Sequence, residues 1–255
     1  MNKITVEDIS FSYEKRTLFS NLSATFVDSE FCAIIGPNGS GKTTLLKCIG
    51  HLLPVKSGNI QVNGQSINSF PPTELAKLIS YVPQRQDNIF EMSVHDIVMM
   101  GLYPYQKRWQ RPSSQDEAIV QEMMTRCNLL DLQERLCNEL SGGEMQRTLI
   151  ARAMAQQTPI MLLDEPLANL DVAHRYEIMD ILARLNQQGV MILIILHEFP
   201  IAIEYATHAL LMKEGKILLH DVQSRVLTPE NLRHCFDLHN DFSISANGLI
   251  CKKNI

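Results

Sequence analysis

A glycine-rich segment between an apolar run and a helix-forming run constrains this chain more than any other feature. Residues 36–43 read Gly-Pro-Asn-Gly-Ser-Gly-Lys-Thr and satisfy the pattern G-x-x-x-x-G-K-[ST]. The run before it, 31–35, is short and apolar and predicts a buried strand, whereas the run after it, 44–47, favours a helix. Such a strand–loop–helix unit is typical of an α/β fold.

The loop has the composition of a phosphate cradle. Glycine lets the backbone turn tightly so that its N–H groups point inward, and the helix start adds partial positive charge. Lys42 is then expected to reach the β- and γ-phosphates, and Thr43 to ligate Mg²⁺. The residues expected at a nucleoside triphosphate are Gly36, Pro37, Asn38, Gly39, Ser40, Gly41, Lys42, Thr43 and Thr44. The motif alone does not choose among kinases, GTPases and ATPases, and a chance match in a glycine-rich turn is the alternative.

Two acids follow a second apolar run at residues 160–163. Ligands collect at the carboxyl ends of parallel strands, so Asp164 is expected beside the phosphate loop, where it holds Mg²⁺ directly or through water. Glu165 is then placed to polarise the attacking water, which is a poor nucleophile on its own. The alternative is a solvated acidic turn, which Pro166 would also fit.

A second anion site is indicated at residues 140–147, Leu-Ser-Gly-Gly-Glu-Met-Gln-Arg. Ser141 and Glu144 form the capping-box pattern S-x-x-E, which predicts that a helix starts here. Gly142 and Gly143 leave backbone N–H groups bare at the positive end of that helix. Since the phosphate loop already supplies one cradle, this second one suggests the hypothesis that it serves another molecule's nucleotide.

Composition excludes several classes of protein. The 255 residues, 45% of them hydrophobic, suffice for one large globular domain or a core with a subdomain. A formal net charge of -5 gives no drive toward nucleic acid or anionic lipid. The six cysteines form no CxxC pair and no zinc-like spacing, so reduced thiols are expected. The longest apolar run, 190–196, is too short to span a membrane, and the acidic N-terminal segment does not resemble a signal peptide.

Strand and helix patterns alternate along the chain. Residues 4–9 alternate as a half-buried strand, and 190–196 reads as a buried parallel strand. Apolar residues recur at helical spacing from Val172 until Gly189, a suitable C-terminal cap. Strands at 209–213 and 216–220 are predicted to form a hairpin around Glu214-Gly215. The stretch from about 92 to 157 is rich in helix formers and predicts a helical insertion into an α/β core.

The segment at 140–144 resembles the LSGGQ signature of the ABC transporter ATPase family. The family's other motifs follow in family order along nearly the whole chain, as Tyr13, the loop 36–43, Gln84, Asp164-Glu165, Leu170-Asp171 and His197. Two details depart from many relatives, which carry Ser or Thr near Ala168-Asn169 and Asp in place of Glu198. These departures concern communication within a dimer rather than ATP hydrolysis.

The resemblance implies a role for each of these residues. Tyr13 stacks on the adenine ring, which is worth about 1 kcal/mol beyond burial. Gln84 contacts Mg²⁺ or the attacking water, and His197 contacts the γ-phosphate and holds the water with Glu165. Asp171 closes a dimer seam near the partner's phosphate loop. Taken alone, Tyr13 and Gln84 could be ordinary surface residues, His197 a strand-end residue and Asp171 a helix N-cap.

The resemblance also implies a fold, a P-loop NTPase (RecA-like) core with a mostly parallel sheet, an antiparallel β part at the N-terminus and a helical subdomain. Within a single ABC ATPase domain of residues 1–255, we place the core at about 1–90 and 157–225. The helical subdomain is expected at about 91–156 and a C-terminal tail at about 226–255.

The expected partners follow from the same resemblance. Two copies of the chain form a homodimer that closes on two ATP molecules with Mg²⁺, and residues Ser141–Glu144 of one copy complete the site on the phosphate loop of the other. Integral membrane permease subunits bind the dimer, and a periplasmic or extracellular substrate-binding protein acts indirectly. No nucleic acid is expected. The chain then works at the cytoplasmic face of the inner or plasma membrane, as a peripheral subunit.

Residues 90–104 bear on the transported substrate. They resemble the segment V-x-x-V-V-x-M-G-R-Y-P of ATPases from importers of iron-siderophores, haem or cobalamin, although Leu102 replaces the usual Arg, and residues 226–232 are also similar to theirs. Importers of zinc, manganese or other small ions are the alternative. A non-transport ABC ATPase acting on nucleic acid or ribosomes is disfavoured, because the chain has neither a second ATPase domain nor a long insertion. The basic, aromatic patch at 105–111 is expected to be a solvated loop.

Overall fold

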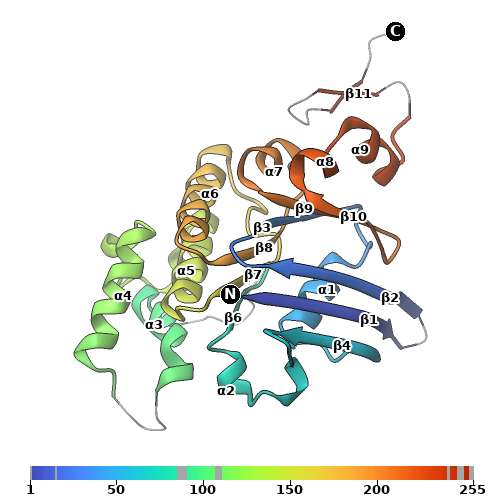
Figure 1. Ribbon diagram of the computed structural model, residues 1–255. Coiled ribbons are helices and arrows are strands. Elements are labelled where there is room, and N and C mark those ends of the chain that lie inside the picture. The colour runs from blue at the N-terminus through green and yellow to red at the C-terminus, as the bar shows by residue number, and fades with distance from the viewer. Residues whose placement is uncertain are drawn as a thin grey trace. The chain divides into compact units, whose positions relative to one another are not determined.

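The computed structural model describes residues 2–14, 16–84, 91–106, 111–239, 242–245 and 250–252 (Figure 1). The chain forms two compact units. Unit 1 comprises Met1–Ser69 with Met191–Ile255, and unit 2 comprises Phe70–Val190. The bounds expected above for the core, the helical subdomain and the tail stay a prediction.

Unit 1 contains an antiparallel sheet with the strand order β2-β1-β4-β5 (Figure 1). Its strands are β1 (Lys3–Tyr13), β2 (Arg16–Val27), β4 (Ser57–Val62) and β5 (Gln65–Ser66). β1 and β2 form a long hairpin, in which Lys3 pairs with Val27 and Tyr13 with Arg16. Ile4, Val6 and Ile9 of β1 are buried, so the half-buried strand predicted at 4–9 is confirmed as part of a longer one.

A second set of strands in unit 1 has the order β10-β9-β3-β8. These strands are β3 (Phe31–Ile35), β8 (Met191–Ile195), β9 (His208–Lys213) and β10 (Lys216–Val222). β3 runs parallel to both β8 and β9, whereas β9 and β10 form an antiparallel hairpin. Every side chain of β3 and β8 is buried, which explains their uninterrupted apolar sequences. The predicted buried strands and the hairpin around Glu214-Gly215 are confirmed.

Helices complete unit 1. They are α1 (Lys42–Ile49), η1 (Ile67–Ser69), α7 (Phe199–Tyr205), α8 (Gln223–Val226) and α9 (Pro229–Cys235), and a short hairpin of β11 (Phe242–Ile244) and β12 (Ile250–Lys252) follows them. α1 starts directly after the glycine-rich loop and buries Leu45, Leu46 and Ile49. α1 also contacts β8, so the loop that precedes it is anchored at both ends by buried elements.

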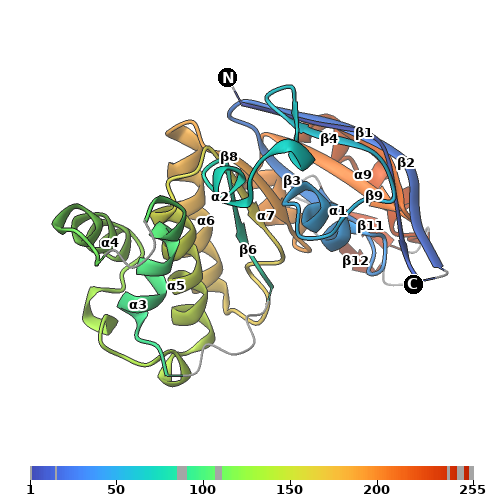
Figure 2. The same cartoon turned by 90° about the horizontal axis from the view of Figure 1, so that it is seen from below.

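Unit 2 combines a parallel strand pair with helices (Figure 2). Its elements are α2 (Pro72–Leu75), β6 (Ile79–Val82), α3 (Val94–Met99), η2 (Met100–Tyr105), α4 (Ser114–Arg126), η3 (Leu130–Leu132), η4 (Cys137–Glu139), α5 (Gly142–Ala155), β7 (Ile160–Leu163) and α6 (Val172–Gln187). β6 and β7 pair with Ile79 opposite Ile160, and Asp164 N–H extends this ladder by donating to the carbonyl of Val82 at 2.9 Å. α6 ends close to Gly189, which has a φ of 93°, so the predicted helix is confirmed.

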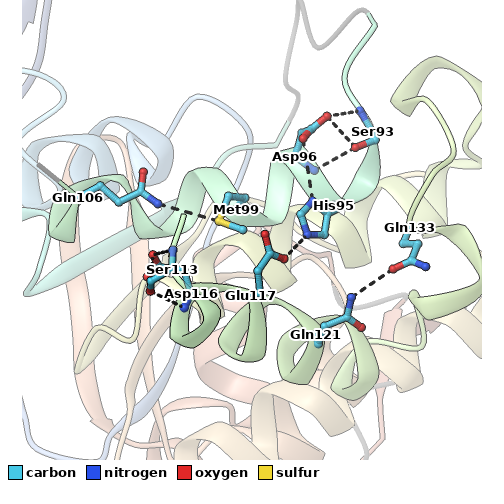
Figure 3. Close-up of polar contacts among 10 residues, drawn as sticks. All are labelled: Ser93, His95, Asp96, Met99, Gln106, Ser113, Asp116, Glu117, Gln121 and Gln133. Carbon is cyan, nitrogen blue, oxygen red and sulfur yellow. Dashed lines mark hydrogen bonds and ion pairs between the residues drawn. The ribbon is translucent and has the colours of Figure 1, made fainter. Parts of the chain in front are cut away.

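Helices α3, α4 and α5 of unit 2 lie in mutual contact (Figure 2). Capping boxes start α3 and α4, in which Ser93 and Ser113 exchange hydrogen bonds with the acid three residues later (Figure 3). His95 Nε2 of α3 lies 2.8 Å from Glu117 Oε2 of α4, which ties the two helices together (Figure 3). Helices account for most of the described residues between about 92 and 157, as predicted.

Within the described ranges, no helix has both the length and the apolar character needed to cross a membrane. Most of the basic, aromatic patch, residues 107–110, lies outside the described residues, as does Phe90 at the start of the segment that bears on the substrate. The expectations for those residues stay predictions.

Candidate active site

The phosphate loop joins β3 to α1 and requires glycine at defined positions. Gly39 and Gly41 adopt φ angles of 77° and 104°, a left-handed region that disfavours residues with a Cβ. Gly36 lies directly against the backbone of β9, because a Cβ at this position would overlap the carbonyl oxygen of Met212. The sequence pattern thus reflects a strand, a tight turn and a helix start, the arrangement that a phosphate cradle requires.

Lys42 lies at the start of α1, and only 5% of its surface is exposed. Its Nζ donates hydrogen bonds to the carbonyl oxygens of Gly36 at 2.8 Å and Pro37 at 3.0 Å. These carbonyls hold the ammonium group over the turn of the loop. A phosphate bound within the turn would meet a cation that is already in place.

A hollow of about 420 Å³ opens beside the loop within unit 1. Its walls are Arg16, Thr17, Leu18, Pro37, Asn38, Gly39, Ser40, Lys213, Glu214 and Asp237. This volume falls in the range of small-molecule sites, about 300–1,000 Å³. Lys213 and Asp237 form an ion pair of 2.6 Å on its wall, which fixes the end of α9 near β9.

Tyr13 ends β1 with 52% of its surface exposed. Its hydroxyl lies 3.3 Å from Thr44 Oγ1 in α1, and its ring packs edge-on against Phe11 with a centroid distance of 4.8 Å. The ring is therefore fixed near the start of α1 while much of its surface stays available, as stacking on a flat base requires. His197, which also belongs to unit 1, is exposed just beyond the end of β8.

The two acids after β7 lie in unit 2 and differ in their environment. Asp164 is 2% exposed and accepts a hydrogen bond of 2.9 Å from the hydroxyl of Tyr81. Burial, together with the charge of Asp164, raises the pKa of Tyr81 well above its usual range, so this phenol stays a donor. A buried carboxylate held in this way is a hard oxygen ligand of the kind that Mg²⁺ prefers.

Glu165 is held by the glutamine that the family resemblance singles out. Gln84 Nε2 donates to Glu165 Oε2 at 2.6 Å, so two predicted site residues that are 81 positions apart lie in contact. Glu165 also has a φ of 50°, a strained value for a residue other than glycine. Such strain is concentrated at functional sites, where the surroundings enforce it.

The turn before α5, residues Ser141–Gly143, has the predicted cap. Ser141 Oγ accepts from Glu144 N–H at 3.3 Å, and Ser141 N–H donates to Glu144 Oε2 at 2.8 Å. These hydrogen bonds lower the pKa of Glu144. The Ser141 side chain thus satisfies one of the N–H donors at the positive end of a 14-residue helix.

Asp171 is the N-cap of α6, which is the role expected for this residue without the family resemblance. Its Oδ1 accepts from His174 N–H at 2.9 Å and lies 2.8 Å from His174 Nδ1. The His174 ring in turn lies against Gly143 of the signature turn. Within unit 2, Asp171 and the signature turn are therefore joined through one side chain.

Tyr81 and His174 contact predicted site residues, although the sequence pattern did not single them out. A histidine three residues after an N-cap aspartate is a local signal that could have indicated His174. Tyr81 reaches Asp164 only because β6 lies beside β7, and no local pattern predicts that pairing. The predicted residues in unit 1 are Tyr13, the loop residues and His197, and those in unit 2 are Gln84, Asp164, Glu165, Ser141–Glu144 and Asp171. That the two sets act on one nucleotide stays a prediction.

Comparison with known proteins assigns the family. Residues 19–168 match the family model described as "ABC transporter". The petrobactin import ATP-binding protein of Bacillus anthracis is 35% identical over 240 residues, which cover 93% of this chain and 88% of that protein.

Solved structures agree in fold. An inward-facing ABC transporter assigned to the metal-chelate type has a chain that superposes with a TM-score of 0.82 at 30% identity, covering 93% of this chain and 90% of that one. A dimeric bacterial ABC transporter cassette gives a TM-score of 0.78 at 26% identity, covering 86% and 98%. The fold is thus the P-loop NTPase fold with mixed α/β sheets that was predicted. The chain belongs to the ABC transporter family and is one of its ATP-binding cassettes, the ATPases of these transporters.

Proposed function

We propose that this chain is the ATP-hydrolysing subunit of an importer that takes up a metal chelate such as an iron-siderophore, haem or cobalamin complex. The observation that carries the proposal is its similarity over nine-tenths of its length to a petrobactin import ATP-binding protein, at 35% identity. The structural similarity to a transporter of the metal-chelate type supports the same substrate class.

Nucleotide binding draws on the residues of unit 1. Tyr13 stacks on the adenine ring, and the backbone N–H groups of the loop 36–43 surround the phosphates. Lys42 neutralises the β- and γ-phosphates, exchanging carbonyl partners within the loop for phosphate oxygens. The buried position of its ammonium group strengthens this attraction, because water competes less there.

The donor set of the chain fits Mg²⁺. Thr43, Gln84 and Asp164 would hold the ion through a hydroxyl, an amide and a carboxylate oxygen, which are hard ligands. The ion, when bound, offsets negative charge on the phosphates. Asp164 is buried and oriented by Tyr81 before any ion arrives, which reduces the reorganisation that binding requires.

Hydrolysis depends on orienting one water molecule. Glu165 accepts a proton from that water as it attacks, and His197 contacts the γ-phosphate and helps to hold the water. The hydrogen bond of 2.6 Å from Gln84 fixes the Glu165 carboxylate, so a change at Gln84 alters the direction in which this base points.

Two chains share two ATP molecules in this proposal. The turn Ser141–Gly143 and Glu144, the capping partner of Ser141, meet the triphosphate held by the other subunit. Asp171 lies at the seam between the subunits. Dimeric cassettes among the similar structures support such an assembly. Closure on ATP and reopening after hydrolysis would move integral membrane permease subunits, because the two states bind those subunits differently. A substrate-binding protein outside the cytoplasmic membrane would deliver the chelate, and this subunit would stay at the cytoplasmic face.

Glu165→Gln tests the assignment of the catalytic base. The variant should bind ATP as the wild type does, form a stable ATP-dependent dimer and hydrolyse ATP at least about 100-fold more slowly, because removal of a general base costs 10²–10⁴-fold. Light scattering measures the dimer and phosphate release measures the rate. Glu230→Gln, at an exposed glutamate far in the sequence from these motifs, is the matched control and should retain the wild-type rate. Wild-type hydrolysis by Glu165→Gln would refute the assignment.

The substrate class requires the complete transporter. The chain should be isolated from membranes with its permease, reconstituted in vesicles, and supplied with the binding protein loaded with an iron-siderophore complex, haem, cobalamin, zinc or manganese. The proposal predicts that a chelate stimulates ATP hydrolysis and accumulates in the vesicles. Stimulation by zinc or manganese alone would instead establish a small-ion importer.

A further inference from the structure

The two glycines of the signature turn have different surroundings. Apart from its two chain neighbours and the backbone of its own helix, none of the described residues places an atom within 4 Å of a Cβ built on Gly142, whereas a Cβ on Gly143 would lie 3.2 Å from both Cγ and Cδ2 of His174. Carbon atoms in optimal contact are about 3.5–4.0 Å apart, so the His174 ring covers Gly143 closely. Gly142 is open to an approaching molecule. Position 143 requires a residue as small as glycine, because the imidazole of His174 occupies the space beside it.

The orientation of the His174 ring is fixed from the opposite side. Asp171 Oδ1 lies 2.8 Å from Nδ1 of the ring and also accepts the backbone N–H of His174. Because a carboxylate only accepts hydrogen bonds, Nδ1 carries a proton. The hydrogen bond from the backbone N–H of His174 makes the largest contribution to lowering the pKa of Asp171, so this carboxylate stays ionised in neutral solution.

We propose that His174 is a positioning residue that couples Asp171 to the signature turn, with its ring packed on Gly143 and its Nδ1–H bound to Asp171. The proposal rests on the function proposed above, in which both Asp171 and the signature turn lie at the seam with a second subunit. One side chain then sets the spacing between the start of α6 and the start of α5. His174 acts through these two groups and does not itself touch ATP.

Such a residue should affect closure of the dimer more than binding of ATP to one subunit. The phosphate loop and Tyr13 lie in unit 1, far along the sequence from His174, so ATP affinity of the monomer should not depend on it. The parent for the experiment is Glu165→Gln, whose ATP-dependent dimer accumulates. Adding His174→Ala should weaken dimerisation about tenfold, within the range that coupled contacts show. The melting temperature and the affinity of the monomer for a fluorescent ATP analogue should change little.

Two conservative variants separate the two contacts of His174. His174→Asn keeps a donor near the position of Nδ1 but removes the ring, whereas His174→Phe keeps a ring against Gly143 but removes the donor. Each should dimerise more tightly than His174→Ala and more weakly than the parent. This partial rescue is a result that a general loss of stability does not produce. The two variants also keep the test decisive if His174→Ala folds poorly.

A double-mutant cycle tests the contact with Gly143 directly. Gly143→Ala should weaken the dimer strongly when His174 is present, because the new methyl group displaces the ring. The same substitution should cost several-fold less in the His174→Ala background, where the space is free. Gly142→Ala is the matched control, since its Cβ meets no described residue beyond its chain neighbours and the backbone of its own helix, and its effect should be the same in both backgrounds.

The outcomes distinguish this inference from the proposed function. If the Glu165→Gln parent forms no ATP-dependent dimer, the composite site is wrong and the coupling has no role. If the parent dimerises but all His174 variants dimerise equally well, the coupling alone is wrong. Equal effects of Gly143→Ala with and without His174 would also overturn it, whereas partial rescue together with a smaller effect of Gly143→Ala would establish it.

Discussion

At the scale of single residues, a close backbone approach explains why residue 101 is glycine. A Cβ at this position would overlap the carbonyl oxygen of Arg152 and lie 3.0 Å from the Cβ of Ala155, so η2 rests directly on α5. We expect Gly101→Ala to lower the free energy of unfolding by about 1–3 kcal/mol, the range for overpacked cores. Gly142→Ala, where the described residues leave the space open, should melt near the wild-type temperature. Equal losses in the two variants during thermal unfolding would contradict this account.

Local motifs were predictable from the sequence, because each depends on a few neighbouring residues. The turn and helix start at 36–43, the acids after β7 and the cap at Ser141 all have the predicted local structure. The contacts of Tyr81 with Asp164 and of His174 with Gly143 could not be predicted, because they depend on which elements pack together. Hydrophobic periodicity defines the buried face of an element but not the element that covers it.

Leu102 shows how one departure from a family pattern is accommodated. The family segment that residues 90–104 resemble usually has Arg at this position, whereas Leu102 is only 2% exposed in η2. A leucine fits an apolar buried position without a charged partner, and an arginine here would need one. Leu102 is therefore accommodated in η2 as an ordinary buried apolar residue.

At the scale of elements, helix starts carry much of the information in unit 2. α3, α4 and α5 all begin with a serine whose side chain accepts from the backbone N–H of the residue three positions later, and the acid at that position accepts a hydrogen bond from the backbone N–H of the serine. Each such cap typically contributes about 1 kcal/mol. Helix existence in this region was therefore predictable, whereas the contact between His95 of α3 and Glu117 of α4 required the tertiary structure.

Strand β10 carries a histidine that should make stability depend on pH. The His220 ring packs on Phe26 at a centroid distance of 4.8 Å, and its Nε2 lies 3.9 Å from Cys32 Sγ. Burial, with a smaller contribution from His208, lowers the pKa of His220. The unfolded chain therefore binds the proton first, so stability is complete above a pH of about 6.5 and falls as the pH drops below that value.

His220→Phe tests this dependence while keeping a ring against Phe26. Between pH 7.5 and 5.5 the melting temperature of the wild type should fall more than that of the variant, because only the wild type must protonate a buried imidazole. The pair of His208 and Glu30, whose Nε2 and Oε1 atoms lie 3.9 Å apart, is present in both proteins, so the difference between the two melting curves isolates His220. Parallel melting curves over this range would show that His220 does not contribute.

At the scale of the whole molecule, the chain carries one phosphate loop and one signature turn. In the proposed homodimer each ATP uses the loop of one subunit and the turn of the other, so the two halves of a site never come from the same chain. Two-fold symmetry then makes both sites identical. A site assembled within one chain would instead make every subunit independent of its partner.

Mixing two inactive variants distinguishes these arrangements. Lys42→Ala disables the loop, and Ser141→Arg blocks the turn without touching the loop, so each variant alone should hydrolyse little ATP. In a mixed dimer, the intact loop of the Ser141→Arg chain faces the intact turn of the Lys42→Ala chain, and one site is complete. An equal mixture contains mixed dimers in half of the population, so hydrolysis should recover to about a quarter of the wild-type rate if the sites act independently. Recovery should disappear on dilution below the concentration at which dimers form. A mixture as inactive as its two components would mean that loop and turn of the same chain serve the same nucleotide.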